Sequence, residues 1–488
     1  MNRDEMFDGV RARTKPWDII VIGGGATGVG CAVDAASRGL AVLLLERHDF
    51  GKGTSSRSTK LIHGGVRYLA QGNISLVREA LRERAILLRN APHVVHKQVF
   101  IIPCFSLWQK IFYGSGLKIY DLLAGKYRIG RSQLLTKSKT LEYLPTLKPK
   151  LLSGGILYYD AQFDDTRLLL DLTATACEHG AVALNYAGVS GLTKNAFGKV
   201  DGVEFEDRET GEPFIAAAKC VINATGVFCD DVRKMSDATS KPLVTLSQGV
   251  HLVLDRSFLP SDAAVMIPKT IDGRVLFCIP WHGHTLVGTT DTPISETDPE
   301  PAAQRAEIDF ILEMAGNYLR KQPTREDILS VFAGIRPLVR SDAAKNTASI
   351  SRGHTIEVDR SQLITITGGK WTTYRRMAED AIDTASRIAG LDAKPSQTQS
   401  LTIKKPAEPF LQSNKHLHPE LPYTGDDVVK AVREEIARTV EDVLARRTRA
   451  LFLNANAAIE MAPAVAIIVA IELNKNVEWI ESQIKAFE

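Results

Sequence analysis

A short run of the chain gathers hydroxyl, cationic and imidazole side chains around glycines. Residues 53–69 read GTSSRSTKLIHGGVRYL. Hydroxyl and backbone N–H groups beside glycines can enclose a phosphate, and lysine or arginine can balance its charge. Histidine is the side chain that most readily moves a proton near neutral pH. A solvated loop is the alternative, because small polar residues are also typical of turns.

A glycine-rich turn just upstream favours the phosphate interpretation. Gly23, Gly25 and Gly28 form a G-x-G-x-x-G pattern that begins within the apolar run WDIIVIGGG. The following GVGCAVDAASRGL predicts a helix, and AVLLLER predicts a second buried strand, so a parallel β-α-β unit is expected. In such a unit the helix N-terminus faces a pyrophosphate, and an acid such as Glu46 holds ribose hydroxyls. The alternative is a plain glycine-rich turn with Glu46 exposed.

Two later turns indicate which dinucleotide is bound. NATG (223–226) and TGGK (367–370) each end a predicted buried strand, and strand-like segments lie between them. A nicotinamide-dependent enzyme usually has a compact Rossmann domain in one piece. A nucleotide domain assembled from distant segments therefore favours FAD, although each turn taken alone is also typical of ordinary α/β folds.

The composition of the 488-residue chain excludes several classes of protein. Apolar residues make up 44% and charged residues 24%, which is typical of a globular protein of two or three domains. A net charge of +3 gives no indication of nucleic-acid binding. The six scattered cysteines form no C-x-x-C pair, so neither a disulfide framework nor a metal site is predicted. No secretory signal is expected, and the longest apolar run, 461–471, is short for a membrane span and contains Pro463.

Periodicity predicts the elements around these motifs. Helices are expected over 74–93, 166–181, 306–319 and 372–390, and strands over 200–207, 219–226 and 363–369. An antiparallel sheet is expected across 242–292, whereas 94–160 reads as irregular and aromatic-rich. Residues 404–425 read as a linker, and the chain from Asp426 onward reads as mostly helical.

Six motifs in the same order resemble the FAD-dependent glycerol-3-phosphate dehydrogenases. They are GGGATGVG, TSSRSTKLIHGGVRYL, NATG, IPWHGHTLVGTTD, GIRPLV and ITGGKWTTYRRMAEDA, and the resemblance runs from about residue 17 to 395. It implies an α/β fold: a discontinuous, Rossmann-type, glutathione-reductase-like FAD domain with a β-rich substrate cap and a short C-terminal helical region. The expected ranges are 17–93, 161–240 and 334–395 for the FAD domain, 94–160 and 241–333 for the cap, 404–425 for the linker, and 426–488 for a C-terminal region shortened relative to the family.

The resemblance implies oxidation of sn-glycerol 3-phosphate to dihydroxyacetone phosphate. Hydride would pass to flavin N5, and the electrons would pass on to a quinone. One alternative is an oxidase that uses oxygen and acts on glycerol 3-phosphate or on an amine or amino acid. Another is a non-catalytic FAD-binding protein, which would keep the glycines and Glu46 without needing the cations at the substrate.

The expected site draws residues from the whole length of the matched stretch. FAD contacts are expected from Gly23, Gly25, Thr27, Gly28, Glu46, Thr54, Ser55, Ser56, Ser58, Lys60, Ala224, Thr225, Gly226, Gly369, Lys370 and Thr372. The resemblance assigns substrate contacts to Arg67, Tyr68, Arg336, Arg352 and Lys370, of which Arg336 and Lys370 are also expected to act in catalysis. A phosphate is doubly charged near neutral pH, and arginine can bind its oxygens in pairs.

The base that removes the substrate's hydroxyl proton is expected to be a histidine. His251, at the start of a cap strand, is the first choice and His63 the second, and a structural role is the alternative for each. Tyr68 is a substrate hydrogen-bonder or a core aromatic, and Lys370 stabilises reduced flavin unless it is a surface lysine. His282 and His284 read as turn residues.

The segment 105–130 suggests contact with a membrane surface. Trp108, Phe112, Tyr113, Leu117, Tyr120 and Leu122 alternate with Lys110, Lys118, Lys126 and Arg128. Aromatic and cationic residues on one helix suit an anionic lipid surface, and the alternative is a helix packed on the protein's own core. The expected location is therefore cytoplasmic and peripheral, on the inner face of the cell membrane, and a homodimer is left open.

Overall fold

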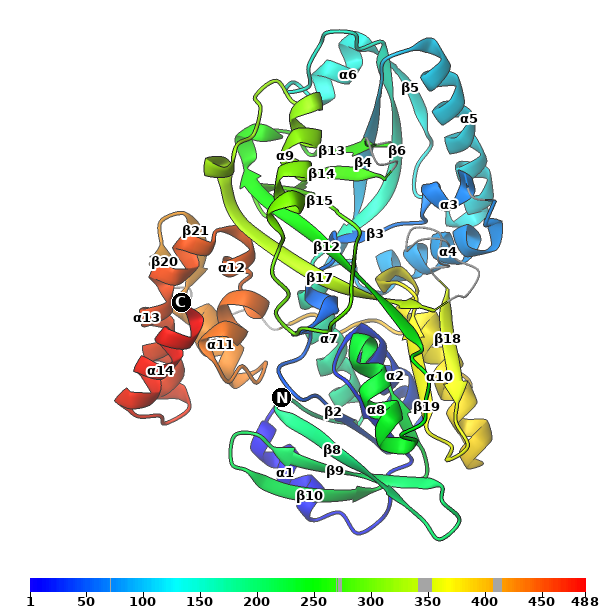
Figure 1. Ribbon diagram of the computed structural model, residues 1–488, viewed down its shortest axis with the longest axis vertical. Coiled ribbons are helices and arrows are strands. Elements are labelled where there is room, and N and C mark those ends of the chain that lie inside the picture. The colour runs from blue at the N-terminus through cyan, green and yellow to red at the C-terminus, as the bar shows by residue number, and fades with distance from the viewer. Residues whose placement is uncertain (71, 269, 271–273, 341–352, 407–414) are drawn as a thin grey trace.

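A six-stranded sheet forms the centre of the lower half of the molecule (Figure 1). The computed structural model describes residues 1–70, 72–268, 270, 274–340, 353–406 and 415–488. The strand order is β18-β19-β11-β1-β2-β7, and β1 pairs in parallel with both β2 and β11. The bounds are β1 Ile19–Ile22, β2 Val42–Leu45, β7 Val182–Leu184, β11 Val221–Asn223, β18 His354–Val358 and β19 Ile364–Gly368. Strands hundreds of residues apart thus make one nucleotide-binding sheet, which confirms the predicted discontinuous Rossmann-type fold.

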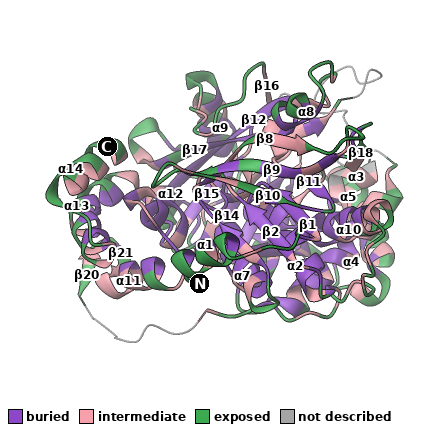
Figure 2. Cartoon of the chain, turned by 90° about the horizontal axis from the view of Figure 1, so that it is seen from below, coloured by how far each residue is buried: buried purple, intermediate pink, exposed green. Residues whose placement is uncertain are grey.

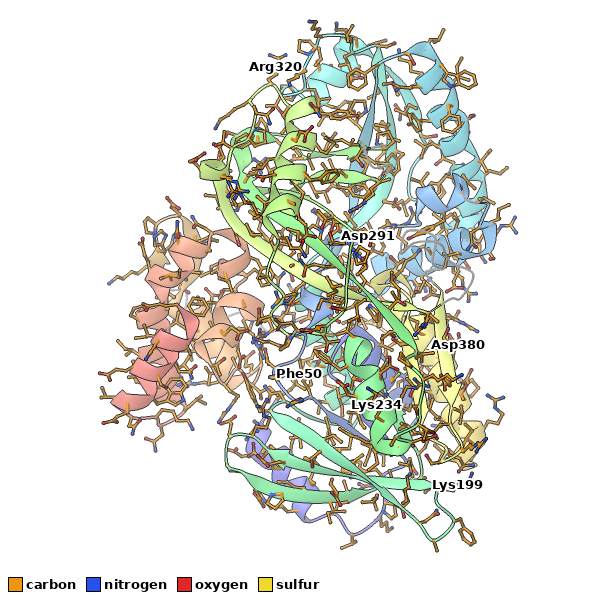
Figure 3. All side chains as sticks on the ribbon, viewed as in Figure 1. Phe50, Lys199, Lys234, Asp291, Arg320 and Asp380 are labelled. Carbon is orange, nitrogen blue, oxygen red and sulfur yellow. The ribbon has the colours of Figure 1, made fainter. Side chains whose placement is uncertain are left out.

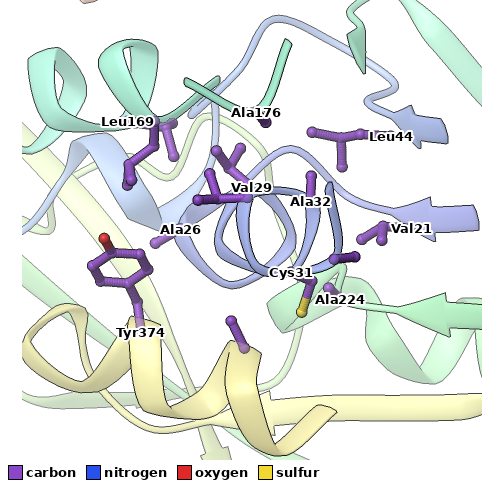
Figure 4. Packing of buried hydrophobic residues seen from close by; sticks show 14 of the residues in the cluster. Val21, Ala26, Val29, Cys31, Ala32, Leu44, Leu169, Ala176, Ala224 and Tyr374 are labelled. Atoms are coloured by element: carbon purple, nitrogen blue, oxygen red, sulfur yellow. The ribbon is translucent and has the colours of Figure 1, made fainter. Parts of the chain in front are cut away.

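Small residues let the helix after β1 pack closely inside this domain. Helix α2 (Ala26–Ser37) lies between α7 (Asp165–Glu178) and α10 (Tyr374–Ala389), as Figure 4 shows. A Cβ atom added at Gly30 would lie 2.8 Å from the ring of Tyr374, so the packing requires a glycine there. Figure 2 shows that strands β1 and β2 and the inner face of α2 are buried between the covering helices.

A ten-stranded sheet forms the cap above the nucleotide domain (Figure 1). Its order is β16-β12-β15-β14-β13-β4-β6-β3, with β17 paired to β12 and β5 to β6. The bounds are β3 Leu61–Ile62, β4 Val95–Cys104, β5 Gln133–Thr136, β6 Gly154–Phe163, β12 Val244–Asp255, β13 Ala263–Ile267, β14 Leu276–Trp281, β15 His284–Gly288, β16 Thr292–Ile294 and β17 Ile328–Val339. The antiparallel sheet predicted over 242–292 is confirmed.

The expectation that 94–160 is irregular is wrong. This stretch holds β4, helix α5 (Leu107–Ala124), β5, α6 (Lys137–Tyr143) and most of β6. β4 and β6 are each ten residues long and pair over their whole length. Their partners are about sixty residues apart, so neither strand carries a local hairpin signal.

The remaining helices and a small sheet surround these two layers. A three-stranded sheet joins β8 (Ala187–Lys194), β9 (Val200–Asp207) and β10 (Glu212–Ala217) below the nucleotide domain (Figure 1). The other helices of the two layers are α1 Arg3–Arg11, α3 Val66–Ala70, α4 Ile74–Asn90, α8 Cys229–Ser236 and α9 Arg305–Tyr318. The helices predicted over 74–93, 166–181, 306–319 and 372–390 are confirmed to within a few residues.

The C-terminal region is a helical cluster beside the cap and the nucleotide domain (Figure 1). It contains α11 Gly425–Arg433, α12 Ala450–Leu453, α13 Ala455–Glu472 and α14 Val477–Phe487. The predicted linker ends too late, because β20 (His416–His418) and β21 (Leu421–Thr424) form a hairpin there. Helix α13 is longer than the apolar run that the sequence indicated, and by length and hydropathy it could cross a membrane. Its inner face packs in the core of this cluster, however, so we interpret it as a packed helix.

Candidate cofactor and substrate site

One cavity of about 670 Å³ collects most of the predicted site residues. It lies where the nucleotide domain meets the cap, and its volume is typical of a ligand site. A second compartment of about 180 Å³ adjoins it and shares Thr59, His63, Tyr68 and Arg336. The predicted residues that line the larger cavity are Gly23, Gly25, Thr27, Glu46, Thr54, Ser55, Ser58, His63, Tyr68, Ala224, Thr225, Gly226, His251, Arg336, Gly369, Lys370 and Thr372.

The glycine turn is shaped as the dinucleotide hypothesis requires. Gly23 has φ +108°, and a Cβ there would lie 2.7 Å from the carbonyl oxygen of Ala224. A Cβ on Gly28 would lie 1.8 Å from the Gly23 oxygen, so Gly28 packs the helix against the turn and does not itself line the cavity. Gly25 supplies no side-chain cap for α2, and the helix N-terminus therefore presents its N–H groups toward the cavity.

Glu46 stands at the end of β2 with both carboxylate oxygens already oriented. Its Oε2 accepts a hydrogen bond from the Gly24 N–H at 2.6 Å, and its Oε1 accepts one from the His48 N–H at 2.8 Å. Burial raises the pKa of this carboxyl even though these hydrogen bonds favour the charged form. A carboxylate oxygen can accept more than one hydrogen bond, so the group can still receive ribose hydroxyls.

The hydroxyl-rich loop after β2 is tied to the other motifs of the site. The Ala26 N–H donates to Ser55 Oγ at 2.9 Å, and Trp371 Nε1 donates to the Ser55 carbonyl at 2.8 Å. Thr54 Oγ1 donates to the Ile335 carbonyl at 2.5 Å. The loop thereby connects the glycine turn, the GGKW motif and strand β17 around a single cavity.

Lys370 lies at the junction of β19 and α10, beside the predicted substrate loop. Its Nζ is 3.8 Å from the centroid of the Tyr68 ring. Gly65 has φ +74°, and a Cβ at that position would collide with the Tyr68 ring and lie 3.6 Å from Lys370 Nζ. The glycine therefore permits the close approach of these two side chains.

Arg336 is held at the boundary of the two compartments. Its Nη2 donates to Thr289 Oγ1 at 3.0 Å and to the Thr290 carbonyl at 3.1 Å. Its Nη1 lies 3.5 Å from Asp291 Oδ1, and Figure 3 shows Asp291 where the cap meets the nucleotide domain. A Cβ on Gly249 would lie 2.2 Å from Nη2, so the guanidinium requires a glycine on the neighbouring strand. Nη1 also donates to the Gln248 carbonyl at 3.3 Å, so the guanidinium is held in place with its charge at the cavity wall.

Both candidate bases reach the cavity. His251 Nε2 lies 2.9 Å from Thr59 Oγ1, and its ring stacks on Phe332 at 4.9 Å between centroids. Its Nδ1 is buried and has no hydrogen-bond partner in the described part of the chain. Burial, and then the charges of Lys60 and Arg336, lower the pKa of His251 well below 6.5. The His63 N–H donates to Thr372 Oγ1 at 3.2 Å, which fixes the backbone that presents its ring.

Comparison with known proteins agrees with the fold and the dinucleotide site described above. A family model for FAD-dependent oxidoreductases matches residues 18–378, and a model for the C-terminal domain of alpha-glycerophosphate oxidase matches residues 364–479. Mitochondrial glycerol-3-phosphate dehydrogenase from Rattus norvegicus is 42% identical over 518 residues, which cover 94% of this chain and 71% of the relative. The chain belongs to the FAD-dependent glycerol-3-phosphate dehydrogenase family.

Solved structures agree with this assignment. Glycerol-3-phosphate dehydrogenase from Bacillus halodurans, solved in complex with FAD, has a TM-score of 0.79 at 30% identity, covering 99% of this chain and 96% of that one. L-alpha-glycerophosphate oxidase from Mycoplasma pneumoniae, solved with FAD bound, has a TM-score of 0.61 at 18% identity, covering 79% of this chain and 97% of that one. The second likeness concerns the fold alone.

As a member of this family, the protein is FAD-dependent, and its cavity fits the cofactor. A Cβ at Gly23 would collide with backbone atoms that border the cavity, so the turn leaves room for a close ligand. The N-cap residue of α2 provides no side-chain hydrogen bond to the helix. Glu46 is held in a fixed orientation beside this turn. Thr54, Ser55 and Ser58 line the same cavity, and the Ser58 hydroxyl donates to Asp165 Oδ2 at 2.7 Å. We infer that these residues hold the cofactor.

Besides Gly28, two of the predicted FAD contacts lie outside the cavity. Lys60 is fully buried and its Nζ donates to Asp165 Oδ2 at 2.6 Å and to the Ser56 carbonyl at 2.7 Å, so it turns away from the cavity. Burial, with the charge of Arg449, lowers the pKa of Lys60 to about 7. The Ser56 hydroxyl donates back to the Gly53 carbonyl. Neither side chain lines the cavity in this structure, because Asp165 at the start of α7 binds the lysine.

Other predicted residues have different outcomes. Arg352 lies outside the described residues, and for Arg67 only the backbone, in helix α3, is described. His282 lies in the turn between β14 and β15, as predicted, and its Nε2 is 3.0 Å from Asp164 Oδ2, whereas His284 begins β15. Sequence reasoning missed Thr59, although it lies inside the hydroxyl-rich run, and Asp160, which belongs to none of the motifs.

Proposed function

We propose that this protein oxidises sn-glycerol 3-phosphate to dihydroxyacetone phosphate and that its electrons pass to a quinone. The observation that supports this most directly is the convergence of Arg336, Lys370 and Tyr68 on one cavity beside two histidines. Cations from separate segments suit a small dianionic substrate better than a neutral alcohol or an amino acid.

Each side chain has a definite task in this proposal. Bound FAD supplies the hydride acceptor. Arg336 binds the phosphate, and Lys370 places positive charge beside Tyr68 in the same cavity. A neutral imidazole accepts the proton of the substrate hydroxyl, and His251 is held neutral by its low pKa and oriented by Thr59. His63 remains the second candidate for this base.

Anaerobic reduction tests the substrate assignment. The yellow holoenzyme should lose its flavin absorbance rapidly when glycerol 3-phosphate is added, and should keep it on that time scale when glycerol or D-alanine is added. If the flavin stays oxidised with glycerol 3-phosphate, the proposed reaction is excluded. If D-alanine bleaches it, the amino-acid oxidase alternative replaces the proposal.

The electron acceptor requires its own test. A soluble quinone should reoxidise the reduced protein faster than air-saturated buffer does, without formation of hydrogen peroxide. Rapid reoxidation by oxygen with one peroxide per turnover would favour the oxidase alternative. The homodimer remains a prediction that mass measurement in solution can check.

Helix α5 supports a peripheral location on a membrane. One face of it leaves large apolar side chains in solvent: Leu107, Trp108, Ile111, Phe112, Ile119 and Leu122 are between 50% and 78% exposed. Lys118 and Lys126 are also exposed, at the same helix and just beyond it. An apolar stripe flanked by cations suits an anionic bilayer surface, and the inner face of the cell membrane is such a surface. By contrast Leu117 and Tyr120 are buried, so the packing alternative holds for the opposite face.

A further inference from the structure

A buried carboxylate in the cap contacts the loop that carries His63 and Tyr68. Asp160 is in strand β6, is 3% exposed, and belongs to none of the motifs that led to the site. Its Oδ1 accepts hydrogen bonds from the Gly64 N–H at 3.1 Å, from Arg84 Nη1 at 2.6 Å and from the Tyr120 hydroxyl at 2.8 Å. One carboxylate oxygen thus joins the loop to helices α4 and α5.

Strand register explains why this carboxylate takes the Gly64 N–H. β3 pairs antiparallel with β6, with Leu61 opposite Gln162 and Ile62 opposite Ala161. The ladder ends there, and the position that would continue it on β6 is Asp160. The Asp160 side chain therefore accepts the Gly64 N–H in place of a backbone carbonyl, at the point where the loop leaves the sheet.

The side chains of this cluster pack closely around Gly64. A Cβ on Gly64 would lie 2.3 Å from the Tyr120 hydroxyl oxygen and 2.6 Å from a methyl of Leu81. Arg84 is 1% exposed and also donates to the Tyr159 carbonyl at 3.2 Å, so the guanidinium is fixed independently of the loop. A buried carboxylate that is paired with a fixed cation is held in one orientation.

The other side of the loop is fixed by the nucleotide domain. Thr372 accepts the His63 N–H, and Lys370 lies on the Tyr68 ring. We propose that Asp160, oriented by Tyr120 and Arg84, is a positioning site that holds the His63–Tyr68 loop at the substrate. Tyr120 itself does not line either compartment, so it acts on the substrate site through Asp160 and through its packing at Gly64.

Tyr120→Phe tests the proposal, because it removes one hydroxyl and leaves the ring in the core. We expect hydrogen exchange in the peptide that covers His63 to Tyr68 to accelerate roughly tenfold, since Asp160 loses one of its orienting donors. We also expect the concentration of glycerol 3-phosphate that half-saturates flavin reduction to rise roughly tenfold, with a smaller change in the limiting rate.

Thr210→Val is the matched control. The Thr210 hydroxyl donates to Asp207 Oδ2 at 3.0 Å, and that carboxylate is also buried against an arginine, Arg3, at the far end of the molecule. Thr210→Val should leave unchanged both the hydrogen exchange of the His63–Tyr68 peptide and the half-saturating concentration of glycerol 3-phosphate. Exchange and half-saturation in Tyr120→Phe within twofold of the parent would overturn the proposal. The substrate identity rests on the proposed function, but the exchange measurement does not, so a parent enzyme that fails to react with glycerol 3-phosphate would refute the function and still leave the positioning role testable.

Discussion

At the scale of single residues, His251 combines three features that suit a base. It is buried, its Nε2 contacts Thr59, and Phe332 stacks on its ring. Because Nδ1 is buried, the lone pair that can serve a substrate is that of Nε2, which faces the Thr59 hydroxyl at the cavity wall. The low pKa keeps that lone pair available across the physiological range.

The pKa of His251 also has a consequence for stability. Below pH 6.5 the unfolded histidine binds a proton that the folded one does not, so acid favours unfolding. Between pH 6.5 and 5 the free energy of unfolding of the parent should therefore fall about 1.4 kcal/mol per pH unit more steeply than that of His251→Asn. Urea unfolding of both proteins across this range measures the difference. Parallel curves would show that His251 is not held neutral.

The motif residues could be predicted because their geometry depends on local sequence. Gly23, Glu46 and Arg336 lie in short patterns whose backbone requirements are visible in the residues themselves. Lys60 was misplaced because its partner, Asp165, is 105 positions away, and no local pattern reveals that contact. Asp160 was missed for the same reason.

At the scale of elements, α5 has two different faces. Leu117 and Tyr120 pack inward, while Trp108 and Phe112 are 71% and 55% exposed. The double variant Trp108→Ser with Phe112→Ser should bind vesicles that contain phosphatidylglycerol at least roughly tenfold more weakly, because it removes most of the aromatic area available for insertion. Co-sedimentation measures the bound fraction.

The control for this experiment is Phe197→Ser. Phe197 is 87% exposed between β8 and β9, at the opposite end of the molecule from α5 (Figures 1 and 3). It should leave vesicle binding unchanged. Equal binding by the α5 variant and the parent would place the membrane contact elsewhere or remove it.

Elements with local periodicity were predicted well, and elements defined by distant partners were not. The helices α4, α7, α9 and α10 follow from apolar spacing within one window. β4 and β6 pair across the α5 insertion, and their aromatic residues gave no clean alternation. The hairpin β20–β21 was hidden by turn-forming residues typical of a linker.

At the scale of the whole molecule, the C-terminal helices dock on the cofactor loop. Asp49, just after β2, is fully buried against Arg446 at 2.5 Å and against Arg447. Burial raises the pKa of Asp49, but the two arginines outweigh it and lower the pKa overall. Lys52 in the same loop binds Glu441. The C-terminal region therefore helps to hold the loop that lines the large cavity.

Asp49→Asn should weaken the contact between the C-terminal region and the loop after β2. It leaves the buried Arg447 without its carboxylate partner and removes one of the three carboxylates that bind Arg446. We therefore expect a loss of about 3 kcal/mol in the free energy of unfolding together with faster release of FAD. Glu142→Gln, which breaks an exposed pair with Lys139, should change neither. Parent-like stability and FAD retention in Asp49→Asn would show that the docking does not support the cofactor site.

The central claim is that Arg336 recognises the phosphate of the substrate. Anaerobic flavin reduction of the parent and of Arg336→Gln, each with glycerol 3-phosphate and with glycerol, tests it most directly. We expect the second-order rate with glycerol 3-phosphate to fall roughly a hundredfold in the variant, and the slow rate with glycerol to stay the same. An equal loss with both substrates, or no loss with glycerol 3-phosphate, would contradict it.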